Sequence, residues 1–451
     1  MHDTRDAIEF YHSLLDPRTA GESHDQLVAQ QQQRGLFFGD RALCTVLRPR
    51  FLHPKQYRSL QESIRAIMPA FAKAHEAALA DADFRYQFRL NDWEEELVHL
   101  DPGFAAPSPT ARMDTFFDEQ DGLWITEYNA ETPAAIAYND ALTEVFLALP
   151  VIREFEKRYD LRPLPGRHSM LHTLLDCYRA WGGQEKPRIA ILDWHEVPTY
   201  SEFVLFRDYF ASHGYECVID DPRDVTYTNG RLYAEGRPIH IIYKRVLISE
   251  LEARGGRNHP VFKAVRERAV CMVNPFRCKI LHKKASLAVL SDEANAHLFN
   301  ARERRAIAAH IPWTRVVAER KTEIDGKPID LLNHLTKHKN DYVLKPNDEY
   351  GGKGIVLGWE VDQPQWERAL RTALAEPSIV QRRVNLPKFP YASWVDGDVH
   401  IYDRMLDTNP YLWYGQYMSG CLTRLSTASL LNVTAGGGST VPTFVVEKRI
   451  P

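Results

Sequence analysis

The sequence predicts an α/β (α+β) protein with more than one domain, and three stretches carry that prediction. A hairpin pattern spans residues 112–133, a strand–helix–strand unit spans residues 189–221, and two strands joined by a glycine loop span residues 342–360. At 451 residues the chain is too long for one compact core, so two or three domains are expected. Hydrophobic content of 44% and charged content of 26% are those of an ordinary soluble protein, and a net charge of -4 gives no general attraction to nucleic acid.

Cysteine use and the N-terminal sequence favour a cytoplasmic protein. The six cysteines are scattered without CxxC spacing, which argues against a zinc site and against a disulfide framework. The first residues, MHDTRDAIEFYHSLL, are charged and lack the apolar core of a signal peptide. No run approaches the roughly 18 apolar residues of a membrane span. We therefore expect no membrane association.

Residues 1–105 are expected to form a helical N-terminal region with breaks at Pro17 and Pro54. In YRSLQESIRAIMPAFAKAHEAALA the apolar residues, among them Leu60 and Phe71, recur at helical spacing. After the hairpin, AAIAYNDALTEVFLAL predicts another helix. None of these stretches indicates chemistry.

The stretch RMDTFFDEQDGLWITEYNAETP predicts a β-hairpin with an Asp-Gly turn. A four-residue loop over 119–122 places Asp118 opposite Leu123. Under that register Asp114 faces Glu127, and Arg112 faces Asn129. Because directly opposed residues share a face, these four side chains form one polar quartet.

The quartet indicates a magnesium site, since two carboxylates and a carboxamide are hard oxygen ligands. Arg112 beside them would hold a negatively charged group. Phe116 and Ile125 are expected on the same face, and the apolar face is expected to carry Met113, Phe117, Trp124 and Tyr128. The alternative is a solvated hairpin face with an Asp/Arg pair.

From about Pro163 the pattern changes to that of a βαβ unit. IAILDW and ECVIDD predict strands on either side of the helix SEFVLFRDYFASHGY, so a parallel sheet is expected. His195, Lys244 and Arg245 lie at strand ends, where open α/β sheets bind ligands. Equally, Lys244 and Arg245 fit a surface strand, and His195 fits a plain loop histidine.

The stretch NPFRCKILHKKASLAVLSDEAN predicts a turn followed by a helix carrying Lys279, Lys283 and Lys284, which by itself fits a solvated helix face. YVLKPNDEYGGKGIVLGWE then predicts two strands joined by a glycine loop, with Lys345 near the end of the first. Glycine allows backbone N–H groups to approach a phosphate closely. No GK[ST] opens a helix here, so the loop is not a Walker A motif.

The remaining sequence predicts strands. IVQRRV is a short strand, SWVDGDVHIYDRMLD a strand pair with a DG turn, and TFVV a strand near the C-terminus. The run before TFVV carries Arg424, Asn432 and a second glycine cluster, Gly436 to Gly438. That cluster also fits a flexible linker, but the apolar strand after it favours a place within the fold.

These stretches resemble the ATP-grasp ligases with circularly permuted order, in the branch of glutathionylspermidine synthase-like proteins. The resemblance spans residues 112–446 and rests on the hairpin, the lysine stretch, the glycine loop with IVQRRV, and RLSTASLLNVTAGGGSTVPTFVV. It implies ATP and Mg²⁺ as cofactors and a pre-ATP-grasp-like βαβ substrate domain. It divides the chain into the N-terminal region (1–105), a metal-binding hairpin part (106–162), the substrate domain (163–272) and the lysine, glycine-loop and C-terminal core part (273–451).

The resemblance also implies roles for individual residues. The metal ligands carry over to Asp114, Glu127 and Asn129, which are three of the four hairpin residues. Phosphate-binding lysines correspond to Lys279 and Lys345, and the arginine that meets an acyl phosphate to Arg112. The mobile lid corresponds to Tyr350, Gly351, Gly352 and Gly354, and the adenine strand, Val380 to Val384, supplies Gln381 and Val384.

The implied activity is an ATP-dependent carboxylate–amine ligase that forms an amide or peptide bond through an acyl phosphate and releases ADP and phosphate. Its partners would be a small carboxylate and an amine, such as an amino acid, peptide or polyamine. Relatives commonly carry an acidic residue where this chain has Arg382, followed by Arg383, and the chain lacks the amidase half of the bifunctional synthase. The alternative is a non-catalytic nucleotide-binding or scaffold protein that retains the fold.

Overall fold

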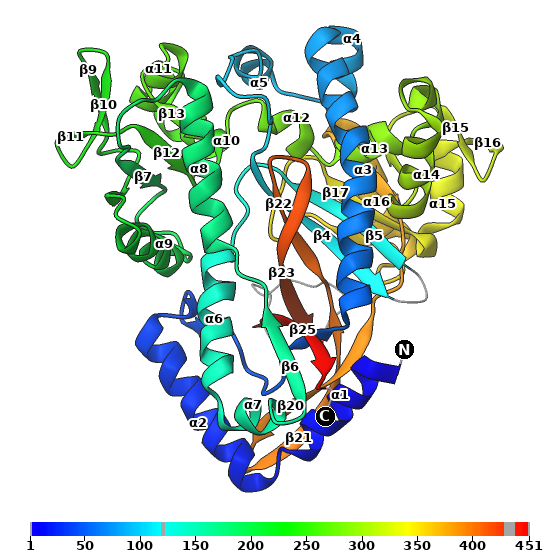
Figure 1. Cartoon of the computed structure of the whole chain (residues 1–451). Helices are drawn as coiled ribbons and strands as arrows, with labels where there is room; N and C mark the ends of the chain where they lie inside the picture. The colour runs from blue at the N-terminus through cyan, green and yellow to red at the C-terminus, as the bar shows by residue number, and fades with distance from the viewer. Residues whose placement is uncertain (1, 119–121, 428–437, 450–451) are drawn as a thin grey trace.

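A computed structural model describes residues 2–118, 122–427 and 438–449. Mixed helices and sheets confirm the predicted α/β (α+β) class (Figure 1). Asn432, Gly436 and Gly437 lie outside the described residues, as do residues 119–121 of the predicted hairpin loop, whereas Gly438 is described. Among the described residues, no helix is long and apolar enough to cross a membrane. All six cysteines are free.

The N-terminal region is mainly helical, as predicted. Its elements are α1 (His2–Ser13), α2 (Pro17–Arg34), β1 (Phe37–Phe38), β2 (Arg41–Ala42), β3 (Arg50–Leu52), α3 (Pro54–Ala80), α4 (Ala82–Arg85), η1 (Tyr86–Phe88) and α5 (Asp92–Leu97). Pro17 and Pro54 each open a helix, where proline loses no helical hydrogen bond. Asp16 caps α2, and His53 with Gln56 forms a capping box at α3.

The largest sheet has seven strands and contains the predicted hairpin. Its order is β20-β21-β23-β22-β4-β5, with β24 paired to β23. The strands are β4 (Thr110–Asp118), β5 (Gly122–Asn129), β20 (Lys388–Val395), β21 (Asp398–Leu406), β22 (Asn409–Trp413), β23 (Tyr417–Ser426) and β24 (Ser439–Val441). The long helix α3 packs on the apolar face of the hairpin, where Phe71 meets Tyr128 edge to face at 4.9 Å (Figure 1).

The predicted βαβ unit belongs to a four-stranded parallel sheet of order β13-β12-β7-β8. This part contains α8 (Arg167–Trp181), β7 (Ile189–Leu192), α9 (Tyr200–Ser212), β8 (Cys217–Asp220), β9 (Thr226–Thr228), β10 (Arg231–Ala234), β11 (Arg237–Pro238), β12 (Ile241–Lys244), α10 (Ile248–Gly255), α11 (Pro260–Arg266) and β13 (Cys271–Val273). One face packs against α8 and α9 and the other against α10 and α11. Apolar residues predominate in all four strands, because helices cover both faces of the sheet, and the charged residues Asp220 and Lys244 stand at strand ends.

The glycine loop joins strands of a third sheet, of order β14-β19-β17-β18. This part contains α14 (Ala301–His310), β14 (Thr314–Val316), β15 (Lys321–Ile324), β16 (Lys327–Asp330), α15 (Leu331–Lys337), η3 (Lys339–Asp341), β17 (Tyr342–Pro346), β18 (Val356–Leu357), α16 (Gln363–Ala375) and β19 (Ser378–Arg382). Helices α15 and α16 cover one face through Leu335 and Trp366. The opposite face carries Lys345 and Gln381.

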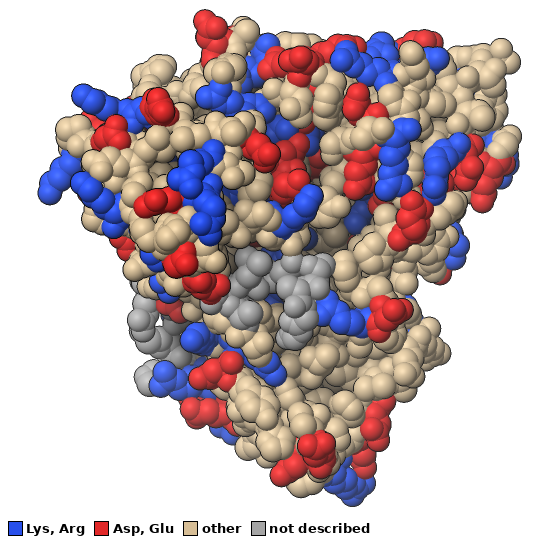
Figure 2. All heavy atoms as spheres, turned by 180° about the vertical axis from the view of Figure 1, so that it is seen from behind, with Lys and Arg blue, Asp and Glu red and all other residues tan. Residues whose placement is uncertain are grey.

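The remaining elements join these parts. They are α6 (Ile136–Ala148), α7 (Pro150–Phe155), β6 (Tyr159–Pro163), α12 (Cys278–His282), α13 (Ala285–Ser291), η2 (Glu293–Leu298) and β25 (Thr443–Lys448). β25 lies between β3 and β6, so the two ends of the chain share one small sheet. Figure 2 shows positive and negative side chains interspersed over the upper part of the back face. Opposite charges interspersed in this way produce little net field there.

The predicted continuous helix over the lysine stretch is wrong. The stretch forms two short helices, α12 and α13, and the break falls at Lys283, whose ψ of 129° is not helical. The N–H of Lys284 donates to the backbone oxygen of Asn347 at 3.0 Å rather than continuing the helix. The break sends neighbouring lysines to different partners.

Candidate functional site

The hairpin strands β4 and β5 bring the predicted polar quartet together. Arg112 lies directly opposite Asn129, and Asp114 directly opposite Glu127. These pairings agree with the predicted register. The opposite face packs into the core beneath α3, so alternation along the strands turns the quartet away from that core.

Nearer the turn, the predicted register is wrong by one residue. A β-bulge at Thr126 shifts the pairing, so Asp118 faces Gly122 instead of Leu123. Ile125 therefore lies in the core, where Trp124 was expected, and Trp124 pairs with Phe116 on the quartet's face. The predicted register assumed that side chains alternate regularly along both strands, and the bulge places one extra residue, Thr126, in β5.

Asp114 is held as a carboxylate by two arginines. Its Oδ1 accepts from Arg112 Nε and from Asn129 Nδ2, both at 2.9 Å, and its Oδ2 accepts from Arg424 Nη2 at 2.7 Å. Burial alone would raise the pKa of Asp114, but Arg112 and Arg424 outweigh it and hold the pKa well below its usual range. Arg424 also binds Asp407, with Nε 2.7 Å from Oδ2.

Glu127 and its neighbour Thr126 face two lysines. Lys284 Nζ lies 3.0 Å from Glu127 Oε1. Lys345 Nζ donates to the backbone oxygen of Thr126 at 3.0 Å and to Gln381 Oε1 at 2.8 Å. Burial lowers the pKa of Lys345 to about 8, while Glu127 acts in the opposite direction.

Lys279 lies in a separate buried ionic cluster. Its Nζ lies 2.8 Å from Asp348, 3.2 Å from Glu131 and 3.3 Å from Glu94. Burial would raise the pKa of Glu131, but Lys279 and Lys244 outweigh it and lower the pKa to about 2. The ion pairs of Lys279 among the described residues include none with the quartet.

The strand-end cations Lys244 and Arg245 are buried, which contradicts the surface-strand alternative. Lys244 is 1% exposed and its Nζ lies 3.4 Å from Glu131 Oε1. Arg245 lies 3.3 Å from Glu202 and donates to the backbone oxygen of Pro133 at 2.9 Å. Both side chains therefore tie the parallel sheet to the segment that follows the hairpin.

The glycine loop reaches the parallel-sheet part of the molecule. Gly351, Gly352 and Gly354 have φ between 66° and 78°, a conformation that other residues adopt only with strain. A Cβ at Gly354 would also lie 2.7 Å from Pro346 Cγ. The hydroxyl of Tyr350 contacts Glu250 Oε1 on α10 at 3.4 Å.

The predicted adenine strand ends at Arg382, so Val384 follows it rather than belonging to it. Arg382 Nη1 lies 3.5 Å from Asp325, and Arg383 stacks 4.1 Å above the ring of Trp359. Both arginines and Val384 line a cavity of about 680 Å³ that also includes Trp124. The described lining includes none of the quartet, Lys279 or Lys345. The cavity is therefore distinct from the cluster of charges on the hairpin.

Two residues that contact the quartet, Lys284 and Arg424, carry no signal in the local sequence that assigns them this role. Lys284 was one of several lysines on an expected helix, and only the break between α12 and α13 singles it out. Arg424 comes from β23, far away in the sequence, and no local pattern links it to Asp114. His195 pairs with Asp224, with Nε2 3.6 Å from Oδ2.

The quartet's chemistry fits a magnesium ion. Asp114, Glu127 and Asn129 offer hard oxygen donors and are each partly exposed. Partial exposure suits Mg²⁺, which keeps several coordination positions for water or phosphate. Arg112, Arg424 and Lys284 balance the carboxylate charge in the structure described here.

Fold and sequence comparisons place the protein among the ATP-grasp proteins. The profile of the circularly permuted ATP-grasp type 2 family matches residues 87–426, and the chain belongs to this family. The structure is similar to that of a glutathione synthetase-like effector from Globodera pallida, with a TM-score of 0.60 and 12% identity over 95% of this chain and 98% of that one. At that identity the likeness concerns the fold alone.

Two curated relatives come from Frankia species and are provisionally named glutamate–cysteine ligases. The Frankia casuarinae protein, named 2-2, is 25% identical over 337 residues. The Frankia alni protein, named 2-3, is 24% identical over 338 residues. Each match covers 71% of this chain and 36% of the relative, so the chain spans about a third of the length of these relatives.

Proposed function

We propose that this protein is an ATP-dependent ligase that joins a carboxylate to an amine and releases ADP and phosphate. The observation that carries the proposal is the direct opposition of Asp114 and Glu127 on the hairpin face beside Lys345. Two carboxylates next to a lysine of the glycine-loop sheet suit a metal–triphosphate complex. Family membership supports the same reaction class.

Asp114, Glu127 and Asn129 would hold Mg²⁺ at this site. When bound, the ion would neutralise charge on the terminal phosphates of ATP. Arg112 and Arg424 keep Asp114 ionised, because their guanidinium groups stabilise its carboxylate. Asn129 donates to Asp114 and so keeps the carboxamide beside the carboxylates.

Lys345 and Lys284 would contact the phosphates. Each lies against β5 and already faces an oxygen there, of Thr126 and Glu127 respectively. Lys279 was the other expected phosphate lysine, but Glu94, Glu131 and Asp348 surround its ammonium group. We therefore assign the second phosphate contact to Lys284 and give Lys279 the role of holding the buried acids in place.

The proposed reaction has two displacements. A carboxylate oxygen of the first substrate attacks the γ-phosphorus, the bond to the bridging oxygen breaks, and ADP leaves. The amine then attacks the acyl carbon, inorganic phosphate leaves with the electrons of the C–O bond, and the nitrogen loses a proton. Arg112 would steady the acyl phosphate from its place beside Asp114.

Two further parts would complete the site. The loop from Tyr350 to Gly354 would close over the phosphates and exclude water, which would otherwise hydrolyse the acyl phosphate. Gln381 and the backbone up to Val384 would contact the adenine. The side chains of Arg382 and Arg383 are engaged with Asp325 and Trp359, so they are assigned no base contact.

The substrates are proposed as small molecules. The names of the Frankia relatives make glutamate and cysteine the first pair to test. Other amino acids, dipeptides and polyamines follow, since each supplies a carboxylate, an amine or both. The buried cations at the end of β12 lie beside the hairpin and are candidates for shaping the carboxylate pocket.

The decisive experiment measures ADP release from ATP and Mg²⁺ with pairs of these substrates, together with mass detection of the amide product. We expect Glu127→Gln to abolish turnover while circular dichroism stays unchanged. Glu319→Gln, at an exposed carboxylate after β14, serves as the control. Full turnover in Glu127→Gln would refute the metal assignment. A protein that binds ATP tightly but turns over no pair would be the nucleotide-binding scaffold instead.

A further inference from the structure

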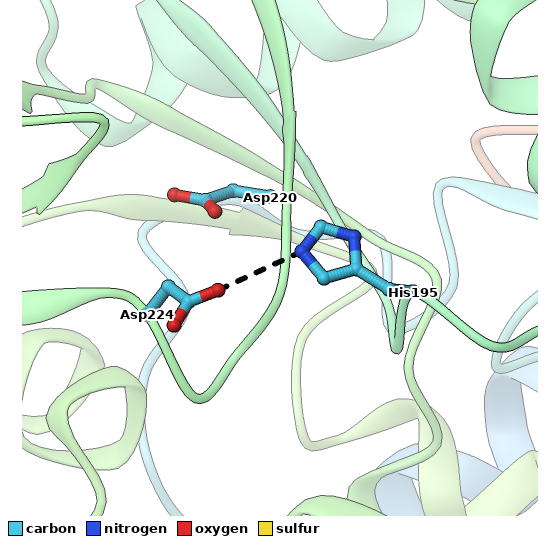
Figure 3. Close-up of side chains that lie close together, drawn as sticks. All are labelled: His195, Asp220 and Asp224. Carbon is cyan, nitrogen blue, oxygen red and sulfur yellow. Dashed lines mark ion pairs between the residues drawn. The ribbon is translucent and has the colours of Figure 1, made fainter.

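Three potential metal ligands meet at the carboxyl edge of the parallel sheet, away from the hairpin quartet. His195 follows β7, Asp220 ends β8, and Asp224 lies in the next loop. One ligand atom of each lies within 4.8 Å of the other two (Figure 3). His195 Nε2 and Asp224 Oδ2 are 3.6 Å apart, and Figure 3 shows the Asp220 carboxylate beside this pair, with one of its oxygens turned to the side of Asp224.

Asp220 supplies the observation that points to a ligand. The residue is only 6% exposed. Its Oδ1 accepts the N–H of Asp221 at 3.0 Å, and its buried Oδ2 has no hydrogen bond of good geometry among the described residues, although the backbone N–H of Glu235 lies near enough to offset part of the rise in pKa that burial causes in this carboxylate. A buried carboxylate oxygen without a donor is costly, and such groups usually have a partner or coordinate a metal.

We propose that His195, Asp220 and Asp224 bind a divalent first-row transition-metal ion such as Mn²⁺ or Zn²⁺. One imidazole and two carboxylates form a mixed nitrogen and oxygen set that suits these ions, whereas Mg²⁺ prefers oxygen ligands alone. Ligand atoms on one such ion lie roughly 3–4.5 Å apart, given bonds of about 2.0–2.2 Å. The side chains of His195 and Asp224 are 52% and 64% exposed, so they are free to close on the ion.

The site adjoins the glycine loop through a short chain of contacts. Trp194, next to His195, donates from Nε1 to Glu250 Oε2 at 2.9 Å. Glu250 also accepts from the hydroxyl of Tyr350 at 3.4 Å. An ion bound at His195 would therefore fix the loop that follows β7. Through Trp194 it would also fix Glu250, which accepts the hydrogen bond from Tyr350. Three protein ligands also leave coordination positions for water or a substrate group.

The test uses Mn²⁺ as the probe, measured by the loss of the free-ion EPR signal, on the untagged 451-residue chain without nucleotide. The Glu127→Gln background removes the proposed ATP-linked metal position. We expect one Mn²⁺ site in that background, and at least tenfold weaker binding after adding Asp220→Asn. Asp208→Asn, an exposed aspartate of α9, should leave the affinity unchanged. The imidazoles of His168 and His172 lie next to each other on α8 and could also bind a metal ion. Mn²⁺ favours oxygen donors, so this pair competes poorly with the proposed site for the probe.

A second variant protects the test against misfolding of Asp220→Asn. His195→Ala alters a half-exposed side chain and should also weaken Mn²⁺ binding at least tenfold, with an unchanged circular dichroism spectrum. Unchanged affinity in a folded His195→Ala or Asp220→Asn protein would overturn the proposal, as would the absence of any Mn²⁺ site in the Glu127→Gln background. None of these readouts requires ligase activity, so failure of the proposed function would leave this test intact.

Discussion

Two adjacent lysines, Lys283 and Lys284, contact different parts of this protein. Lys283 Nζ lies 2.8 Å from Glu94 and 2.6 Å from Asp348, within the buried ionic cluster. Lys284 instead contacts Glu127 on the hairpin. The two lysines stand at the break between α12 and α13, where Lys283 ends α12 with a non-helical ψ of 129° and Lys284 precedes α13. Lys284 is therefore the member of the pair expected to meet ATP.

Lys284→Met should lower kcat/KM for ATP about 10²-fold, the usual effect of removing one preorganised electrostatic contact. The measurement is steady-state ADP release at varied ATP. Lys337→Met, at an exposed lysine of α15, is the matched control and should behave as the parent does. An unchanged kcat/KM in Lys284→Met would show that Lys284 does not contact the phosphates of ATP and that another lysine must do so.

ATP affinity should fall at alkaline pH because of Lys345. Burial lowers the pKa of Lys345 to about 8, so its positive charge is present below that pH and is lost as the pH rises through it. In the free protein about a tenth of Lys345 is charged one unit above the pKa, so ATP should bind up to about tenfold more weakly at pH 9 than at pH 7. Calorimetric titration measures this change. Lys345→Arg stays charged and should show a flatter profile.

Glu131 should make stability sensitive to acid. It is fully buried, and Lys279 and Lys244 overcome the effect of burial and lower its pKa to about 2. An acid with a depressed pKa stabilises the fold above its ordinary pKa near 4.5, and that contribution is lost as the pH falls towards 2. The shift corresponds to at most about 3 kcal/mol. Urea unfolding at pH 6 and pH 3 should show a smaller loss in Glu131→Gln than in the parent.

At the scale of elements, local pattern and family resemblance predicted the features that follow from regular strand alternation and element order. Alternation placed Asp114 opposite Glu127, and strand–helix–strand order predicted the parallel sheet. The local pattern could not predict the bulge at Thr126. A bulge adds one residue to one strand, and no residue type in this strand marks where the addition falls. Nor could the local pattern predict the approach of Arg424 to Asp114, which depends on the pairing of strands distant in sequence. The quartet itself could be predicted because each of its pairs lies within one hairpin.

The contact between the glycine loop and α10 should reduce wasteful hydrolysis. Tyr350→Phe removes the hydroxyl that contacts Glu250 and leaves the ring in place. We expect ADP release in the absence of the amine to rise about twofold to fivefold, because a less ordered loop excludes water less well. The ratio of ADP to amide product measures this coupling. An unchanged ratio would mean that the contact has no part in closure.

At the scale of the whole molecule, the N-terminal region contributes to the hydrophobic core and does not form a separate unit. Helix α3 covers the apolar face of the β4–β5 hairpin, and β3 pairs with β25 near the other end of the chain. The boundary at residue 105 thus separates segments in sequence that share one hydrophobic cluster. The pattern of α3 predicted the helix, but not the surface on which it packs.

Phe71→Ala should destabilise the hairpin from outside the site. Phe71 is fully buried against Tyr128, so its truncation should cost about 3–5 kcal/mol. Leu374→Ala on α16 is the control, since Leu374 is 41% exposed and its truncation should cost about 0.5 kcal/mol or less. Equilibrium denaturation measures both. Equal costs would show that α3 does not support the hairpin.

The place of β4 beside β22 has a consequence for synthesis of the protein. Arg112 pairs with Tyr411, which the ribosome adds about 300 residues later. Until then, β4 has only β5 as a partner, and a lone two-stranded ribbon is marginally stable in water. Pairings so distant in sequence slow folding, and unfinished sheet edges are prone to aggregation. Nascent chains of this protein are thus expected to need chaperone protection until β22 emerges.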